Sequence, residues 1–237
     1  MNIIVIGATS GIGKALFEKY VKGENRLGII GRRTQLLDEL KHHYPSKTHT
    51  ATADITKQDE VEQAISSLQK ELGSIDLAIV CSGIGDLNPS LDYNVERPTI
   101  DTNVIGWTFV VDMLYNLFEQ QGHGHLVAIT SAGGLRGEPM APAYSATKAY
   151  QINYMEALRK KAYKAGGKIT VTDVRPGLVD TAMAKGESLI WVMPVEKVAR
   201  QICTAIRRKK SKVYVTKRWH VLAVINKNLP FFLYRWL

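Results

Sequence analysis

Two patterns of hydrophobic and polar positions alternate along the chain. Short apolar segments rich in β-branched residues indicate buried strands, and longer segments with apolar residues every three or four positions indicate amphipathic helices. Seven strands are predicted, over residues 2–8, 26–31, 48–54, 77–82, 125–131, 168–177 and 212–217. Six helices are predicted between them, over residues 12–21, 34–43, 57–72, 101–120, 143–165 and 194–208.

This alternation of strands and helices predicts the fold class. A strand, a crossover helix and a second parallel strand form a right-handed unit, and repeated units give a parallel sheet covered on both faces. The chain contains no short-period repeat, low-complexity tract or linker rich in Pro, Gly and Ser. We therefore expect one α/β domain over residues 1–237, a doubly wound Rossmann-type domain with a seven-stranded parallel sheet.

The composition is typical of a soluble globular protein, with 45% hydrophobic and 22% charged residues among 237. The two cysteines, Cys81 and Cys203, form neither a metal-ligand spacing nor a disulfide framework. We therefore expect no metal site and a reducing compartment. The chain starts directly with a strand-like segment, without the basic and apolar regions of a secretion signal. These features predict a cytoplasmic protein.

The formal net charge of +9 is concentrated near the C-terminus, where residues 185–237 contain twelve Lys and Arg against Glu187 and Glu196. Aromatic residues are sparsely interleaved with these basic residues, and no recognised nucleic-acid-binding module is present, which argues against a nucleic-acid partner. A basic rim that attracts phosphate-bearing ligands is the favoured interpretation.

Residues 218–237 form an aromatic and basic C-terminal extension. Asn226, Lys227, Asn228 and Pro230 interrupt it well short of the roughly 20 apolar residues that a membrane-spanning helix needs. Three alternatives stay open: packing at a subunit interface or over the substrate, peripheral contact with a membrane surface, and a frayed tail. The interfacial character of the extension comes from five aromatic residues, Trp219, Phe231, Phe232, Tyr234 and Trp236.

The predicted helix around residues 104–118 is unusually apolar and carries a single ionised side chain, Asp112. A helix that is apolar on all sides is expected to be buried on all sides. Because a sheet covers only one face, we expect the other face to meet a second subunit. The sequence therefore predicts a homodimer or homotetramer.

The segment VIGATSGIGKAL places Gly7, Gly11 and Gly13 between the first strand and the first helix. Glycines let the backbone turn tightly and approach a pyrophosphate, and the start of the helix supplies N–H groups. Thr9 and Ser10 add hydroxyl donors. This placement predicts a dinucleotide site rather than a simple tight turn.

The end of the second strand indicates which dinucleotide binds. Sites for NAD usually have an acidic residue there, which accepts the ribose 2′-hydroxyl. This chain has Arg32 and Arg33 instead, and arginine matches the oxygens of a phosphate group. We therefore expect NADP as the cofactor, with NADPH bound in preference to NADH.

Tyr144 and Lys148 lie four residues apart in AYSATKAY, so they share one face of the predicted helix. The ordinary tyrosine pKa of ~10 is too high for acid–base chemistry near neutral pH. A cation about 4 Å away would favour the phenolate by about 4 kcal/mol at a protein-like dielectric. Lys148 is therefore expected to lower the pKa of Tyr144.

In these features the chain resembles the classical short-chain dehydrogenase/reductase family over most of its length. The family's opening glycine motif matches Gly7, Gly11 and Gly13, with Ile6 in place of a threonine. The Asn-Asn-Ala-Gly stretch of the family departs at Val80, Cys81 and Ser82. The remaining matches are Asp54, Gly83, Asn103, Ser131, Tyr144, Lys148 and the Pro-Gly-x-Val-x-Thr positions Pro176, Gly177, Val179 and Thr181.

The resemblance implies an oxidoreductase that transfers a hydride between nicotinamide and a ketone or secondary alcohol. It implies the catalytic residues Asn103, Ser131, Tyr144 and Lys148, in which Ser131 holds the substrate oxygen, Lys148 binds the nicotinamide ribose and Asn103 holds a water. It implies cofactor contacts from Gly7, Thr9, Ser10, Gly11, Ile12, Gly13, Arg32, Arg33, Asp54, Ile55, Ser82, Gly83, Tyr144, Lys148, Pro176, Gly177, Val179 and Thr181.

The resemblance also implies that residues 178–193 form a lid over the substrate. The lid residues Met183, Leu189, Ile190, Trp191 and Met193 indicate an apolar carbonyl or alcohol substrate, and a lid that packs on its own domain would show the same residues. A non-catalytic protein that senses NADP(H) on the same scaffold is the alternative. Such a protein would have no reason to keep Ser131, Tyr144 and Lys148 together.

Overall fold

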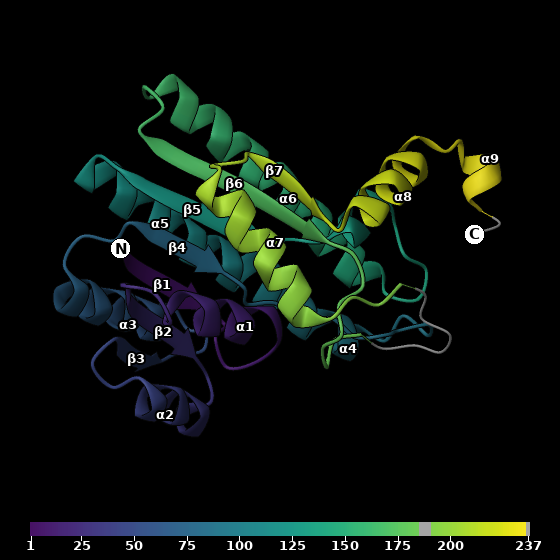
Figure 1. Cartoon of the computed structure of the whole chain (residues 1–237). Helices are drawn as coiled ribbons and strands as arrows, with labels where there is room; N and C mark the ends of the chain where they lie inside the picture. Colours follow the sequence, from purple (N-terminus) through teal and green to yellow (C-terminus); the bar gives the residue numbers. More distant parts are fainter. Residues whose placement is uncertain (185–190, 236–237) are drawn as a thin grey trace.

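The computed structural model describes residues 1–184 and 191–235, and its strands form one seven-stranded sheet in the order β3-β2-β1-β4-β5-β6-β7 (Figure 1). Every neighbouring pair of strands is parallel. This confirms the predicted α/β Rossmann-type fold. The strands are β1 (Asn2–Ile6), β2 (Arg26–Gly31), β3 (Thr48–Thr52), β4 (Leu77–Val80), β5 (Gly124–Ile129), β6 (Ile169–Pro176) and β7 (Lys212–Val215).

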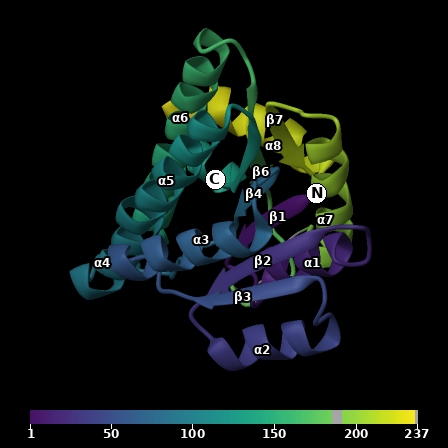
Figure 2. The ribbon, with the colours of Figure 1, turned by 90° about the vertical axis from the view of Figure 1, so that its left-hand side faces the viewer.

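Helices cover both faces of the sheet and divide the hydrophobic core into two layers (Figure 2). Successive side chains of a strand point to opposite faces, so Ile3 and Val5 of β1 enter one layer while Ile4 and Ile6 enter the other. The first layer is closed by α1 (Gly11–Tyr20), α2 (Thr34–His43) and α7 (Val195–Arg207). The second is closed by α3 (Gln58–Leu72), α5 (Trp107–Gln121) and α6 (Pro142–Lys164).

The predicted and observed elements differ most at 101–120. An additional helix, α4 (Tyr93–Ile100), precedes this segment, and residues Asp101–Gly106 form a π-helix, η1, before α5 begins. A side chain at Gly106 would overlap the carbonyl of Ile55, so the π-helix packs directly on the backbone that follows β3. This contact joins segments that are far apart in the sequence, and hydrophobic spacing alone does not reveal it.

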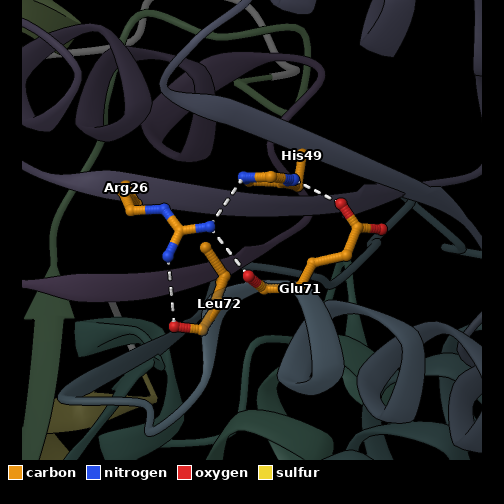
Figure 3. Close-up of polar contacts among 4 residues, drawn as sticks. All are labelled: Arg26, His49, Glu71 and Leu72. Carbon is orange, nitrogen blue, oxygen red and sulfur yellow. Dashed lines mark hydrogen bonds and ion pairs between the residues drawn. The ribbon is translucent and has the colours of Figure 1, made fainter.

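Helix α3 ends in a set of polar contacts at the end of the sheet where the strands begin (Figure 3). The Arg26 guanidinium donates from Nη2 to the Glu71 carbonyl at 2.7 Å and from Nη1 to the Leu72 carbonyl at 3.4 Å. The imidazole of His49 contacts both Arg26 Nη2 and the Glu71 carboxylate. These contacts satisfy the terminal carbonyls of α3 and tie the helix to β2 and β3.

The apolar helix α5 is covered by more than the sheet. Trp107 is fully buried and packs edge-on against Tyr150 and Tyr154 of α6, and α3 lies on the other side. The premise that only the sheet covers this helix is therefore wrong, because neighbouring helices bury most of it. The apolar surface that remains includes Ile105 in η1 and the half-buried side chains of Phe109 and Met113.

The C-terminal extension forms α8 (Lys217–Asn228) and the short α9 (Phe231–Tyr234), which project from the body of the molecule (Figure 1). Arg136 holds them: its Nε donates to the Asn226 carbonyl at 3.0 Å, its Nη2 donates to the Leu229 carbonyl, and its guanidinium lies 4.5 Å from the Tyr234 ring centroid. The extension is thus attached to the loop after Ser131. No helix in the described ranges is long and apolar enough to cross a membrane.

Candidate functional site

The predicted site residues gather at one edge of the sheet. They lie in the segments that follow β1, β2, β3, β4, β5 and β6, and the carboxyl ends of parallel strands meet at one edge. Strand order reverses between β1 and β4, so the turn after Ile6 lies beside the turn after Val80. Ligands of open α/β sheets bind at such a reversal.

The glycine-rich turn has the backbone geometry of a phosphate cradle. Gly7 and Gly11 have φ angles of 82° and 53°, a region that side chains disfavour. A Cβ at Gly13 would overlap the Gly7 carbonyl, so α1 can approach the end of β1 only with glycine at this position. Ile12, between these glycines, packs against the core layer under α1. The free N–H groups at the start of α1 fit the pyrophosphate of a dinucleotide.

Arg33 extends over this turn. Its Nη2 donates to Thr9 Oγ1 at 2.6 Å and to Ser10 Oγ at 2.8 Å, and its Nε donates to Thr9 Oγ1 at 3.2 Å. The side chain is exposed. A guanidinium in this place fits a phosphate group next to the glycine turn.

Arg32 turns to a different partner. Its Nη1 lies 3.5 Å from Asp54 Oδ2, and Thr56 donates to Asp54 Oδ1 from its amide at 3.0 Å and from its hydroxyl at 2.9 Å. Burial on its own would raise the pKa of Asp54, but the Thr56 hydrogen bonds and Arg32 outweigh it and lower that pKa. Asp54 is thus a carboxylate at neutral pH, and Ile55 beside it is buried.

Lys148 and Asn103 meet beside Gly83. A Cβ at Gly83 would lie 3.2 Å from Lys148 Nζ and 3.3 Å from Asn103 Oδ1, so glycine leaves room for both polar groups. Asn103 is fully buried; its side chain accepts from the Ile84 amide at 2.9 Å and donates to the Ile84 carbonyl at 2.7 Å. The asparagine therefore joins η1 to the loop after β4.

Ser131 and Tyr144 meet beside Gly133. A Cβ at this glycine would lie 3.3 Å from Ser131 Oγ and 3.7 Å from Tyr144 Cε1. Ser131 follows β5, and its Oγ accepts a hydrogen bond from the Gly133 amide at 3.0 Å. Tyr144 lies in the first turn of α6 with Lys148 one turn later, and Lys148 Nζ lies 5.8 Å from the tyrosine ring centroid. The four predicted catalytic side chains therefore lie together.

The electrostatics differ from the expectation that Lys148 would lower the pKa of Tyr144. Burial raises the pKa of Tyr144, and the opposing influence is a hydrogen bond with Ser131. The Lys148 ammonium instead donates to Gln151 Oε1 at 2.9 Å and to the Ile129 carbonyl at 3.3 Å. Burial lowers the pKa of Lys148 to about 8, against the effects of Cys81 and Asp173. Tyr144 is thus a protonated phenol at neutral pH, beside a lysine that is mostly charged.

The segment after β6 closes the same edge. The Gly177 amide donates to the Val215 carbonyl at 2.9 Å, which continues the ladder beyond Pro176. Val179 forms a parallel bridge with Met193, and Thr181 lies against Gly11, where a Cβ would be 3.3 Å from its Cγ2. The predicted lid thus starts and ends beside the glycine turn. Two of its predicted apolar residues, Leu189 and Ile190, lie outside the described ranges.

The departure from Asn-Asn-Ala-Gly leaves the backbone path intact. The Cys81 amide donates to the Ile6 carbonyl at 2.8 Å, so pairing of β4 with β1 continues past Val80. The Ser82 amide would lie 2.8 Å from a Cβ at Gly7, so these two turns are in direct contact. Burial raises the pKa of the Cys81 thiol to about 12.

Two residues that the motifs do not include lie at the candidate site: Trp219, which the sequence analysis noted only as an aromatic residue of the C-terminal extension, and Gln151. The indole of Trp219, from α8, packs on Gly177 so closely that a Cβ there would overlap it, and its Nε1 donates to the Trp191 carbonyl at 3.4 Å. Gln151, from α6, contacts Lys148 Nζ. Trp219 is separated from its partners by more than 25 residues, and no spacing signal marks such a contact.

Comparisons with known proteins agree with this geometry. The sequence pattern of the short chain dehydrogenase family matches residues 1–189. An uncharacterized oxidoreductase of Mycobacterium tuberculosis is 32% identical over 223 residues, covering 90% of this chain and 87% of that protein. The NADP-dependent 3-hydroxy acid dehydrogenase YdfG of Escherichia coli is 28% identical over 182 residues, covering 76% of this chain and 73% of that protein.

Solved structures share the fold. A short chain dehydrogenase from Burkholderia cenocepacia in complex with NADP superposes with a TM-score of 0.85 at 20% identity, covering 99% of this chain and 95% of that one. The closed form of a serine dehydrogenase complexed with NADP⁺ gives a TM-score of 0.81 at 23% identity, covering 90% and 92%. The chain therefore belongs to the short-chain dehydrogenase/reductase family and is an NAD(P)-dependent oxidoreductase that acts on CH–OH groups.

Proposed function

We propose that this single-domain chain reduces an apolar ketone to a secondary alcohol, with NADPH as the hydride donor and Ser131, Tyr144 and Lys148 as catalytic residues. One observation carries the proposal. The four side chains predicted from the motifs come from η1, the end of β5 and α6, and they meet at the carboxyl edge of the sheet beside the glycine turn. A sensor without catalytic function would not need that convergence.

In the proposed mechanism the bound cofactor supplies a hydride to the carbonyl carbon, and the protein manages the oxygen. The Ser131 hydroxyl donates a hydrogen bond to the carbonyl oxygen and stabilises the negative charge that develops there. The Tyr144 hydroxyl donates its proton to the same oxygen. Burial keeps this phenol protonated at neutral pH, which suits an acid in the reduction direction.

Lys148 and Asn103 support that proton donor. Lys148 is positively charged below a pKa of about 8, and its ammonium donates to Gln151 and to the Ile129 carbonyl, so we assign it to cofactor binding and not to a shift in the pKa of Tyr144. We propose that the same ammonium binds the ribose hydroxyls of the cofactor and that Asn103 fixes the π-helix η1 beside it. The contacts of Asn103 with Ile84 support that structural part of its role.

The test is Tyr144→Phe, which removes the proton donor and keeps the ring. We expect kcat for ketone reduction to fall at least a thousandfold while the Kd for NADPH changes less than threefold. Tyr163→Phe is the matched control, because Tyr163 lies on the same helix but is exposed. A Tyr144→Phe enzyme with normal kcat would overturn the catalytic assignment. NADPH binding without turnover of any ketone, in the unmodified protein, would favour the sensor alternative.

We propose that residues 178–193 form the substrate lid and that the substrate is apolar. The indole of Trp219 from α8 packs on Gly177 and donates to the Trp191 carbonyl, and Met193 pairs with Val179, so the ends of this segment lie near a large apolar side chain. A panel from small diketones to long-chain and polycyclic ketones, followed by NADPH absorbance, tests this. The proposal expects kcat/KM to rise with apolar surface, and a preference for small charged keto acids would contradict it.

We propose that two copies associate through the surface of η1 and α5. Ile105, Phe109 and Met113 follow one another at intervals of four residues, and Phe109 and Met113 lie beside Glu62 and Ser66 of α3. Ile105 is 56% exposed, and burial of such side chains favours association. Sedimentation at micromolar concentration is expected to show at least a dimer, and Met113→Glu is expected to give a monomer.

We also propose that the protein is cytoplasmic and that its C-terminal extension contacts an anionic membrane surface. The inner side of α8 packs on the body through Trp219 and Ala223. The exposed apolar side chains are Val221, Val224 and Ile225 on α8 and Phe231, Phe232 and Leu233 on α9. Residues 197–237 contain eleven Lys and Arg and no Asp or Glu, which complements a negative surface.

Flotation with vesicles tests this contact. The protein is expected to float with phosphatidylcholine vesicles that contain phosphatidylglycerol and to stay in solution with phosphatidylcholine alone. Phe231→Ser with Phe232→Ser is expected to weaken binding at least tenfold, because burying each ring contributes about 1.5–3 kcal/mol. Tyr163→Ser, an exposed aromatic on another helix, serves as control. Unchanged flotation of the double variant would contradict the proposal.

A further inference from the structure

Gln151 has a fully buried side chain that joins two parts of the proposed site. It lies on α6, three residues after Lys148, and its exposed fraction is 0%. Its Oε1 accepts from Lys148 Nζ at 2.9 Å, and its Nε2 donates to the Asn103 backbone carbonyl at 2.9 Å. Both ends of the amide are therefore bonded.

These two partners fix the orientation of the amide. An ammonium can only donate and a backbone carbonyl can only accept, so the oxygen of Gln151 must face Lys148 and its nitrogen must face Asn103. A buried amide that was turned around would lose both bonds and leave polar groups unsatisfied, at a considerable cost. Gln151 thus acts as a spacer of defined length between the ammonium and η1.

The spacer matters because it joins a flexible lysine side chain on α6 to an unusual stretch of backbone. Asn103 lies in the π-helix, a local feature that is frequent at functional sites. Lys148 has its Nζ beside Gly83 and is further fixed by the Ile129 carbonyl. A flexible lysine side chain has several rotamers, and a second bond from Gln151 selects one of them.

We propose that Gln151 is a positioning residue, which holds the Lys148 ammonium in place and couples it to the π-helix that contains Asn103 through one buried amide. This inference rests on the proposed function of Lys148 and names a residue that the motifs do not include. Gln151 touches neither the glycine turn nor Tyr144 through any of its bonds above, so its effect passes through Lys148.

The proposal has a consequence for the charge of Lys148. A hydrogen bond to the charged form of a group favours that form, so Gln151 raises the pKa of Lys148 against the effect of burial. The other ionisable groups near this lysine are Tyr144 on its own helix, Cys81 after β4 and Asp173 on β6. Asp173 is itself paired with Arg175. None of these changes when Gln151 is replaced.

The test measures the titration of Lys148 in the cofactor-free protein, by NMR of lysine labelled with ¹³C at Cε, with assignment by Lys148→Arg. Gln151→Met keeps the length of the side chain and removes both bonds. Loss of a hydrogen bond to a charged group is expected to lower the titration midpoint by about one pH unit or more. Gln151→Glu keeps an acceptor and adds a negative charge, so the midpoint is expected to rise.

Gln121→Met is the matched control. Gln121 is also a bridging amide, whose Nε2 donates to the carbonyls of Ile75 at 2.6 Å and His123 at 2.7 Å, but it lies at the end of the sheet where the strands begin. The control variant should lose stability without moving the Lys148 midpoint. The pH dependence of NADPH affinity gives a second reading, with the high-pH loss of binding moved down by the same amount in Gln151→Met.

Two outcomes overturn the inference. The first is a Lys148 midpoint that moves by less than about 0.3 pH units, which is less than about 0.5 kcal/mol, in both Gln151 variants. The second is an equal shift in Gln121→Met, which would show a general effect of destabilisation. If Gln151→Met does not fold, Gln151→Glu alone decides: a midpoint that does not rise overturns the inference, because a carboxylate in contact with the ammonium must favour its charged form. Failure of the proposed function would appear separately, as an active Tyr144→Phe enzyme.

Discussion

Replacing Arg33 with alanine should weaken the binding of NADPH and leave the binding of NADH nearly unchanged. The guanidinium of Arg33 is anchored over the glycine turn by Thr9 and Ser10, through its Nε and Nη2 groups. Its Nη1 group makes no hydrogen bond to any residue in the described ranges. Arginine carries five N–H donors, so this group can bind a phosphate without loss of the anchoring bonds.

The expected size of the effect follows from that geometry. A hydrogen bond to a charged group contributes about 1.5–3 kcal/mol, which corresponds to roughly tenfold to 150-fold in affinity. Because Arg33 is exposed, solvent screening places the expected loss near the lower end. NADH lacks the 2′-phosphate and should lose less than threefold. The Kd for NADH divided by the Kd for NADPH should therefore be about tenfold smaller in Arg33→Ala than in the wild type.

Arg32→Ala is the matched control, because Arg32 is already paired with Asp54 at 3.5 Å. Fluorescence titration of the wild type and both variants gives the change in Kd that each variant causes for NADPH and for NADH. A larger loss in Arg32→Ala than in Arg33→Ala would show that the ion pair opens for the cofactor and that our assignment is reversed. Equal losses for NADPH and NADH in Arg33→Ala would show that Arg33 does not distinguish them at all.

Two other predictions concern stability and the C-terminal helix. Burial lowers the pKa of His125 from 6.5 to about 4, so the folded state binds its proton later than the unfolded state does as the pH falls. The free energy of unfolding should therefore drop by up to about 3 kcal/mol between pH 6.5 and 4. Urea unfolding of His125→Gln at several pH values should show a free energy of unfolding that depends less steeply on pH between 6.5 and 4. The same pH dependence as in the wild type would exclude this histidine as the cause. Gly177→Ala should displace Trp219 and lower kcat/KM, with altered tryptophan fluorescence. Gly137→Ala, where a Cβ meets open space, should do neither, and an equal loss in both would contradict the role of Trp219.

The sequence predicted the elements whose information is local. The bounds 26–31 and 34–43 agree with β2 and α2 because β-branched runs and apolar spacing are set within a few neighbouring residues. Every predicted strand except 26–31 ends later than the observed strand, by one or two residues, since the residue that follows a strand can resemble one inside it. Helices α4 and α8 were not predicted, because neither has a single apolar face. Helix α4 is mostly polar, and α8 has apolar residues on both its inner and its outer side.

Spacing along the chain was sufficient to predict the candidate site. Gly7, Gly11 and Gly13 lie at a strand–helix junction, and Tyr144 and Lys148 lie one turn apart, and both facts hold in any parallel α/β arrangement. Tertiary structure alone decided the partners. It turned Lys148 toward Gln151, gave Arg33 rather than Arg32 to the glycine turn, and packed Trp219 on Gly177. The physical reason is that burial and hydrogen bonding depend on which segments are neighbours in space, and sequence spacing does not encode those neighbours.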